Sequence, residues 1–159
     1  MVGINELKVL LLAAAPVFEL RASIPLGFYY WGQEYIWKII LISIIGNFIP
    51  IIPLLLFLEP VSNKLRKFFL WKKFFDWFFE RTKKKAGLVQ KYEVIGLALF
   101  VAIPLPGSGI WTGSVAATLF KIRFRYAFVA ITIGMLIACV LVSLVCVGVL
   151  NLPIFTKSM

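Results

Sequence analysis

Apolar residues in this chain fall into four long runs separated by short polar segments. The runs cover residues 7–31, 36–58, 94–120 and 127–150. Each run is close to the ~20 residues that a helix needs to cross a bilayer. The runs 36–58 and 127–150 contain no charge apart from Lys38, so they predict two spanning helices. The other two runs are interrupted near their centres and need a different explanation.

The run 94–120 is broken by the stretch IPLPGSGIWTG, residues 103–113. Proline removes a backbone donor and glycine costs helix stability, so this stretch predicts a break at mid-depth in the membrane. Such breaks in apolar segments are typical of binding sites between half-helices. We expect Ser108 to be the N-cap of the second half, which directs the following amides into the gap as an anion-binding terminus. The alternative is a spanning helix that is only kinked. The residues expected to form this break are Pro104, Pro106, Gly107 and Gly113.

The run 7–31 is interrupted in a similar way by Pro16, Glu19, Arg21 and Pro25. A charge at the centre of such a run costs ~2.5–3.5 kcal/mol on insertion scales, so both charges are expected to face a cavity or a partner. Ser23 can cap a second half-helix that starts just before Pro25. The sequence therefore predicts a second broken hairpin.

A basic segment over residues 61–91 lies between the two halves. Ten Lys or Arg face only Asp76 and Glu80 between residues 64 and 91, and aromatic residues recur at helical spacing along another stripe. This pattern is typical of an amphipathic helix in the membrane interface that contacts anionic headgroups. Nucleic-acid binding is the weaker alternative beside membrane spans.

Basic loops stay in the cytoplasm, so this segment predicts the orientation of the chain. A second basic cluster, Lys121, Arg123 and Arg125, follows the run 94–120 directly. Both clusters are cytoplasmic if that run enters the membrane, breaks and returns on the same side. A shift of 88 residues places Pro16 on Pro104 and Gly46 on Gly134. We therefore predict one membrane domain over 1–159, all-α, built as two inverted repeats of a re-entrant hairpin plus a spanning helix.

Composition supports an integral membrane protein and argues against an enzyme. The chain is 62% hydrophobic with a mean hydropathy of +0.97, whereas soluble domains are usually ~45–50% apolar. It contains no histidine and no phosphate-loop or cofactor motif, so we expect no metal site, no cofactor and no catalytic residue. A chain this small has little core of its own, which favours a homo-oligomer.

The two interrupted stretches resemble a known family. FELRASIPLG, residues 18–27, followed by IPLPGSGIWTG is similar to the motifs of the prokaryotic small multidrug export family, and the likeness covers nearly the whole chain. More distantly, the chain resembles the DedA and VTT-domain superfamily. That resemblance implies two facing re-entrant hairpins, location in a prokaryotic plasma membrane, and movement of phospholipids or polyprenyl phosphate, often coupled to protons.

Carried over to this sequence, the resemblance implies functional positions in both hairpins. The second tip has no arginine, so Arg21, or Arg123 and Arg125 at the hairpin exit, would supply positive charge to a headgroup. The candidate substrate-binding and coupling residues are Glu19, Arg21, Ser108, Gly109, Trp111 and Thr112.

Three functions remain open from these residues. The favoured one is transport of a phosphate-bearing lipid that is held by Arg21 and the amides after Ser108, with Glu19 exchanging a proton. The second is efflux of small cationic drugs, in which Glu19 is the counter-charge. The third is a membrane scaffold that transports nothing, in which Glu19 and Arg21 only lock the first hairpin.

Overall fold

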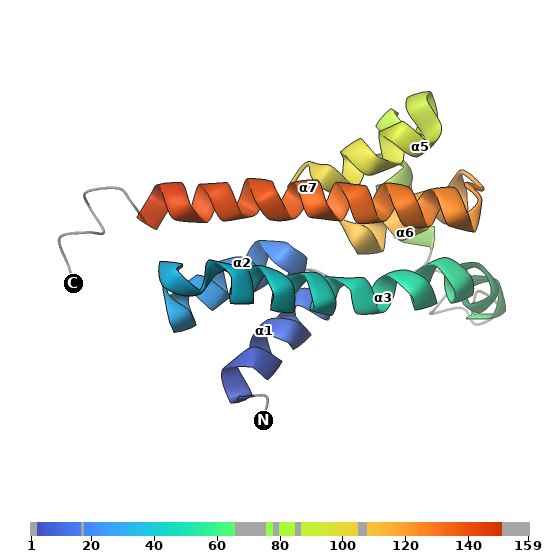
Figure 1. The fold of residues 1–159 in the computed structure, drawn as a ribbon. Helices are drawn as coiled ribbons and strands as arrows, with labels where there is room; N and C mark the ends of the chain where they lie inside the picture. The colour runs from blue at the N-terminus through green and yellow to red at the C-terminus, as the bar shows by residue number, and fades with distance from the viewer. Residues whose placement is uncertain are drawn as a thin grey trace. The chain divides into compact units, whose positions relative to one another are not determined.

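The computed structural model describes residues 3–16, 18–65, 76–77, 80–84, 87–104 and 108–150. Within these ranges the secondary structure is helical, as the sequence predicts (Figure 1). The elements are α1 (Ile4–Ala14), α2 (Glu19–Trp31), a short 3₁₀ helix η1 (Gln33–Tyr35), α3 (Ile36–Leu65), α5 (Gly87–Ala102), α6 (Ile110–Leu119) and α7 (Phe124–Leu150).

Two of these helices are long and apolar enough to cross a membrane. They include residues 33–58, with a mean hydropathy of 2.6, and residues 124–148, with a mean hydropathy of 2.8. This agrees with the predicted spans 36–58 and 127–150. α3 continues as a helix to Leu65, so residues 61–65 extend this helix and do not begin a separate segment. Pro50, Pro53 and Pro60 all lie inside this helix, and prolines are tolerated in helices that cross a membrane.

The chain divides into two compact units, the first of residues 1–48 and 136–159 and the second of residues 49–135. In the first unit, α1 packs against α2, and α3 closes over both. Gly46 makes this approach possible, because a Cβ there would lie 2.5 Å from the Leu10 carbonyl oxygen and 2.7 Å from the Ala13 Cβ. Val9, Ala13 and Ile24 are among the fully buried side chains of this core.

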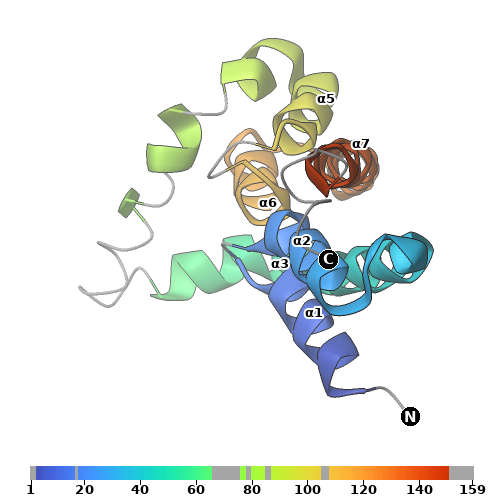
Figure 2. The ribbon, with the colours of Figure 1, turned by 90° about the vertical axis from the view of Figure 1, so that its left-hand side faces the viewer.

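In the second unit, α5 and α6 lie side by side (Figures 1 and 2). α5 is kinked at Glu93, whose φ of 45° and ψ of −111° are not helical. Gly134 of α7 packs on α5, because a Cβ there would lie 2.5 Å from the Ala98 carbonyl oxygen and 2.8 Å from the Val101 Cβ. Leu97 and Val101 are almost fully buried in this core.

The two units correspond when the first is shifted by 88 residues. α1 then coincides with the apolar helix Tyr92–Ala102 within α5, the end of α2 coincides with the end of α6, and α3 begins where α7 begins. The glycine contacts correspond as well, since Gly46 on Leu10 and Ala13 becomes Gly134 on Ala98 and Val101. The units thus share these helix bounds and one close contact. The inverted orientation and the re-entrant path of the hairpins stay predictions.

The first break lies earlier in the chain than predicted. α2 begins at Glu19 and continues through Pro25 to Trp31, so Ser23 is inside a helix and is not an N-cap. Pro25 has no N–H, so α2 lacks the hydrogen bond to the carbonyl four residues earlier. The helix nevertheless continues through this position. The hairpin turn is instead formed around Pro16, between α1 and α2.

Much of the basic segment 61–91 lies outside the described residues. In its described part, the guanidinium of Arg81 lies 5.3 Å from the centre of the Trp77 ring, which is a cation–π distance. The predicted amphipathic helix in the membrane interface stays a prediction.

Candidate functional site

Glu19 stands at the break between α1 and α2 in a strained conformation. Its φ is +49°, which is in the left-handed region, and only 7% of its surface is exposed. Its N–H donates to the Ala15 carbonyl over 3.3 Å. A non-glycine residue held in this region costs of order 1–3 kcal/mol, and such strain is typical of functional sites. The structure therefore places the predicted carboxylate at a buried, strained position.

Arg21 is half-buried and lies within electrostatic range of the Glu19 carboxylate. Residues two apart on a regular helix do not face each other. That rule does not apply here, because Glu19 is in a left-handed conformation at the first residue of α2. The two charges that the sequence singled out in the first hairpin thus lie within electrostatic range of each other.

Asn47 joins the two sides of this break. Its side chain is fully buried, and its amide nitrogen donates to the Ala13 carbonyl over 2.9 Å. The N–H of Leu20 donates to its amide oxygen over 3.0 Å, and these two partners fix the orientation of the amide. A carbonyl at the end of α1 and an amide at the start of α2 are thereby satisfied by α3. Asn47 therefore bonds to two other helices, as a polar side chain in an apolar helix requires.

Ser23 and Ser43 form a second polar link between α2 and α3. Both side chains are fully buried, and the Ser23 hydroxyl donates to the Ser43 oxygen over 3.0 Å. The sequence analysis missed Ser43. A signal was present, since Ser43 and Asn47 are four residues apart and share one face of an otherwise apolar helix.

The second break is closed in a different way. The Ser108 hydroxyl donates to the Ile103 carbonyl over 2.6 Å, across the break between α5 and α6. The N-cap of α6 is Gly109, with a φ of 158°, and no side chain caps this helix. The prediction that Ser108 is the N-cap was wrong, because its hydroxyl satisfies a carbonyl on the other side of the break. Pro106 and Gly107 lie outside the described residues, and Pro104 is exposed at the edge of the break.

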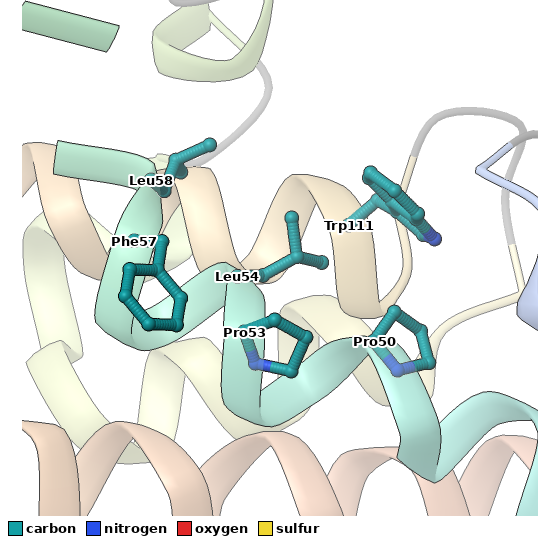
Figure 3. Close-up of a pocket in the computed structure, with 6 residues that line it drawn as sticks. All are labelled: Pro50, Pro53, Leu54, Phe57, Leu58 and Trp111. Atoms are coloured by element: carbon teal, nitrogen blue, oxygen red, sulfur yellow. The ribbon is translucent and has the colours of Figure 1, made fainter. Parts of the chain in front are cut away.

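Trp111 follows directly in the first turn of α6 and forms one wall of a pocket in the second unit (Figure 3). The other residues that line it belong to a stretch of α3 that contains Pro50 and Pro53. The cavity volume is about 220 Å³, and its surface is almost wholly apolar. The pocket is lined by Pro50, Pro53, Leu54, Phe57, Leu58 and Trp111.

The remaining predicted residues of the second hairpin do not line this pocket. The Thr112 hydroxyl donates to the Gly109 carbonyl over 3.4 Å, so it bonds to its own helix. Gly113 is buried, and a Cβ there would lie 2.5 Å from a methyl group of Val101. Arg123 and Arg125 are exposed where α6 leads into α7.

Lys38 and Glu6 form an ion pair in the first unit that was not predicted from the sequence. The Lys38 ammonium donates to the Glu6 carboxylate over 2.6 Å and lies 4.5 Å from the centre of the Trp31 ring. The hydrogen bond from Lys38 is the main cause that lowers the pKa of Glu6, which precedes the first apolar run. Three helices are thus joined by these contacts, since Glu6 is on α1, Trp31 on α2 and Lys38 on α3.

Comparison with protein families gives one match. The profile of the family described as "Putative small multi-drug export protein" matches residues 19–141, which is most of the chain. The chain belongs to this family. The match begins at Glu19, directly after the first break, and covers the second break, the Trp111 pocket, α3 and the part of α7 up to Leu141. Comparison with curated proteins and with solved structures finds no match.

Family membership and the two long apolar helices together indicate a membrane protein of the transporter kind. The family description names export of drugs, and it gives no support to a lipid substrate.

Proposed function

We propose that this protein exports small cationic amphiphiles across the plasma membrane of a prokaryote. The apolar pocket at Trp111 binds the substrate, and Glu19 exchanges the coupling ion. The observation that carries this proposal is the pocket itself, because it adjoins a broken helix in a chain that belongs to an export family. Broken helices are where transporters place their binding sites.

The pocket suits a molecule with a flat apolar body. Ligand sites are mostly apolar cavities of ~300–1,000 Å³, so about 220 Å³ accommodates one ring system of a drug-sized molecule. Trp111 offers an indole face, which attracts a cation within ≈ 6 Å of its centre. An amphiphile with a positive charge beside an aromatic ring satisfies both the apolar walls and the indole.

Glu19 supplies the negative charge that coupling of transport to an ion gradient needs. A buried carboxylate in an apolar segment is expensive and marks an ion or proton pathway in membrane proteins. Its strained φ and the nearby positive charge of Arg21 support a carboxylate that alternates between Arg21 and the coupling ion. We propose that the two hairpins are re-entrant, that the two units are inverted in the membrane, and that they rock to expose the pocket to each side in turn.

A phosphate-bearing lipid is the second candidate substrate. The observation in its favour is that no side chain caps the first turn of α6, whose amides and dipole attract an anion. Arg21 is a suitable phosphate ligand because its guanidinium can form two parallel hydrogen bonds. In this mechanism Arg123 and Arg125 contact the headgroup and the lipid tails stay in the bilayer.

Further parts of the proposal concern partners. We propose that the basic segment 61–91 contacts anionic headgroups, that the chain forms a homo-oligomer, and that it performs transport without catalysing a reaction. Each of these follows from composition and charge.

Transport in purified proteoliposomes tests the function. Ethidium is loaded inside the vesicles, a proton gradient is imposed, and loss of ethidium is followed by its fluorescence. Trp111→Ala should raise the half-saturating ethidium concentration by about 5- to 30-fold, which corresponds to the ~1–2 kcal/mol of a desolvated cation–π contact. The matched control is Trp37→Ala, because Trp37 is 76% exposed and is not among the residues that line the pocket.

The same vesicles separate the alternatives. Flipping of a fluorescent polyprenyl phosphate, with no ethidium transport, would support the phosphate-lipid candidate and overturn cation export. Absence of flux with either substrate, in protein that is folded, would favour the scaffold. Equal loss of ethidium transport in the Trp111 and Trp37 variants would remove the pocket from the mechanism.

A further inference from the structure

The two units differ sharply in polarity at positions that correspond. In the first unit, α2 and α3 carry four buried polar side chains, here called the polar seam: Glu19, Ser23, Ser43 and Asn47. With the shift of 88 residues, their counterparts in the second unit are Gly107, Trp111, Ile131 and Met135. One unit therefore has a polar seam where the other has an apolar contact and the tryptophan of the pocket.

Two hydrogen bonds join α2 to α3 within the polar seam. Ser23 bonds to Ser43 over 3.0 Å, and Asn47 accepts the N–H of Leu20 over 3.0 Å, directly beside Glu19 in the chain. Ser43 and Asn47 are four residues apart on α3, so they lie on one face of that helix. The face of α3 that carries both side chains therefore lies along the first two turns of α2, at whose start Glu19 stands.

Buried serines of the second unit behave differently. The Ser114 hydroxyl donates to the Ile110 carbonyl over 2.7 Å, and the Ser108 hydroxyl donates to the Ile103 carbonyl over 2.6 Å. Both bonds satisfy nearby backbone of their own hairpin. In contrast, the bond between Ser23 and Ser43 joins two side chains across a helix contact, and each hydroxyl oxygen has two lone pairs that can accept.

We propose that the polar seam binds the monovalent cation that drives transport, a proton or Na⁺, while the second unit binds the substrate. Glu19 provides the negative charge, and the oxygens of Ser23 and Ser43 stabilise the bound ion. Hard cations prefer such oxygen ligands. This inference rests on the proposed transport function and deepens it, since it separates the coupling site from the substrate site.

Ion-dependent transport in proteoliposomes tests whether the coupling site and the substrate site are separate. Wild type, Ser23→Ala and Ser43→Ala are compared under a proton gradient and, separately, under a Na⁺ gradient, with ethidium as substrate. The matched control is Ser114→Ala, because Ser114 is equally buried but bonds only to its own helix. Seam variants should raise the half-saturating concentration of the effective ion by about tenfold or more, the scale on which lost supporting groups weaken ion sites. Half-saturation by ethidium should stay unchanged.

A second measurement separates this inference from the proposed function. Binding of radioactive Na⁺, and proton release or uptake on ethidium addition, are measured on purified protein in detergent. If the seam variants retain the ion dependence of wild type in both experiments, the inference is overturned while export stands. Ethidium flux in wild type that responds to neither gradient also overturns it. No flux in wild type overturns export first. Should the alanine variants not fold, Ser23→Cys keeps the volume of the side chain and removes its oxygen.

Discussion

Substitution of Gly46 by alanine tests the packing of the first unit directly. A Cβ at this position would lie 2.5 Å from the Leu10 carbonyl oxygen and 2.7 Å from the Ala13 Cβ. Neither atom belongs to a flexible side chain, so relief requires α1 and α3 to move apart. Overpacking of this kind costs typically 1–3 kcal/mol, while alanine recovers up to ~1 kcal/mol of helix propensity. We expect a net loss of about 1–2 kcal/mol in the free energy of unfolding.

Gly134→Ala should cause nearly the same loss. Its Cβ would lie 2.5 Å from the Ala98 carbonyl oxygen and 2.8 Å from the Val101 Cβ, which repeats the geometry at Gly46. The matched control is Gly148→Ala on α7, because no atom lies within 4 Å of its Cβ position. This control should be neutral or gain up to ~1 kcal/mol from helix propensity.

Unfolding in mixed micelles, titrated with SDS and followed by tryptophan fluorescence, measures all three variants. The reasoning is refuted if Gly46→Ala is as stable as wild type, or if Gly148→Ala is equally damaging. A difference of more than about 1 kcal/mol between the Gly46 and Gly134 variants would show that the two contacts are not equivalent, since each estimate rests on the same overpacking cost.

Two further predictions concern the first unit. Asn47→Leu leaves the Ala13 carbonyl and the Leu20 N–H without their partner, so we expect a loss of about 1–3 kcal/mol in the same SDS titration; unchanged stability would contradict the bridging role. Lys38 lowers the pKa of Glu6 in the folded state, so this pair stabilises the fold at pH values above the ordinary pKa of a glutamate and loses its effect as the pH falls below it. Thermal melting from pH 7 to pH 3 should therefore show a smaller acid-induced fall for Glu6→Gln than for wild type, and equal falls would exclude the pair as the cause.

The sequence predicts the positions of most helices, because proline and glycine mark where apolar helices are interrupted. The prolines and glycines gathered between residues 103 and 113 favour an interruption of the apolar helix, and α5 and α6 do end and begin there. The two uninterrupted runs predict α3 and α7 for the same reason. A lone amide in an apolar run needs a partner, and Asn47 has partners on α1 and α2.

The details of the breaks could not be predicted in the same way. Ser23 and Ser108 are both good N-cap residues, yet each hydroxyl bonds elsewhere, to Ser43 and to the Ile103 carbonyl. The choice depends on which acceptor the tertiary structure brings near, and local sequence does not contain that information. The same holds for the pair of Lys38 and Glu6, which are 32 residues apart.

The Trp111 pocket illustrates a third limit. Trp111 was a candidate from its position after the break, but the α3 residues facing it belong to a run that was interpreted only as a span. Prolines such as Pro50 and Pro53 ordinarily cause bends in a helix. In the structure they form a smooth wall opposite the indole, which only the packing of α3 with α6 reveals (Figure 3).

The glycine contact also bears on how the chain can evolve. At both Gly46 and Gly134 the nearest atom to the missing Cβ is a backbone carbonyl oxygen, which every residue type has. The side chain at that carbonyl is leucine in one unit and alanine in the other, so it can drift without disturbing the crossing. A duplicated ancestral segment could therefore diverge almost everywhere else and still keep the geometry of each half. Such freedom would let one copy acquire buried charged and polar residues while the other copy became apolar at the corresponding positions.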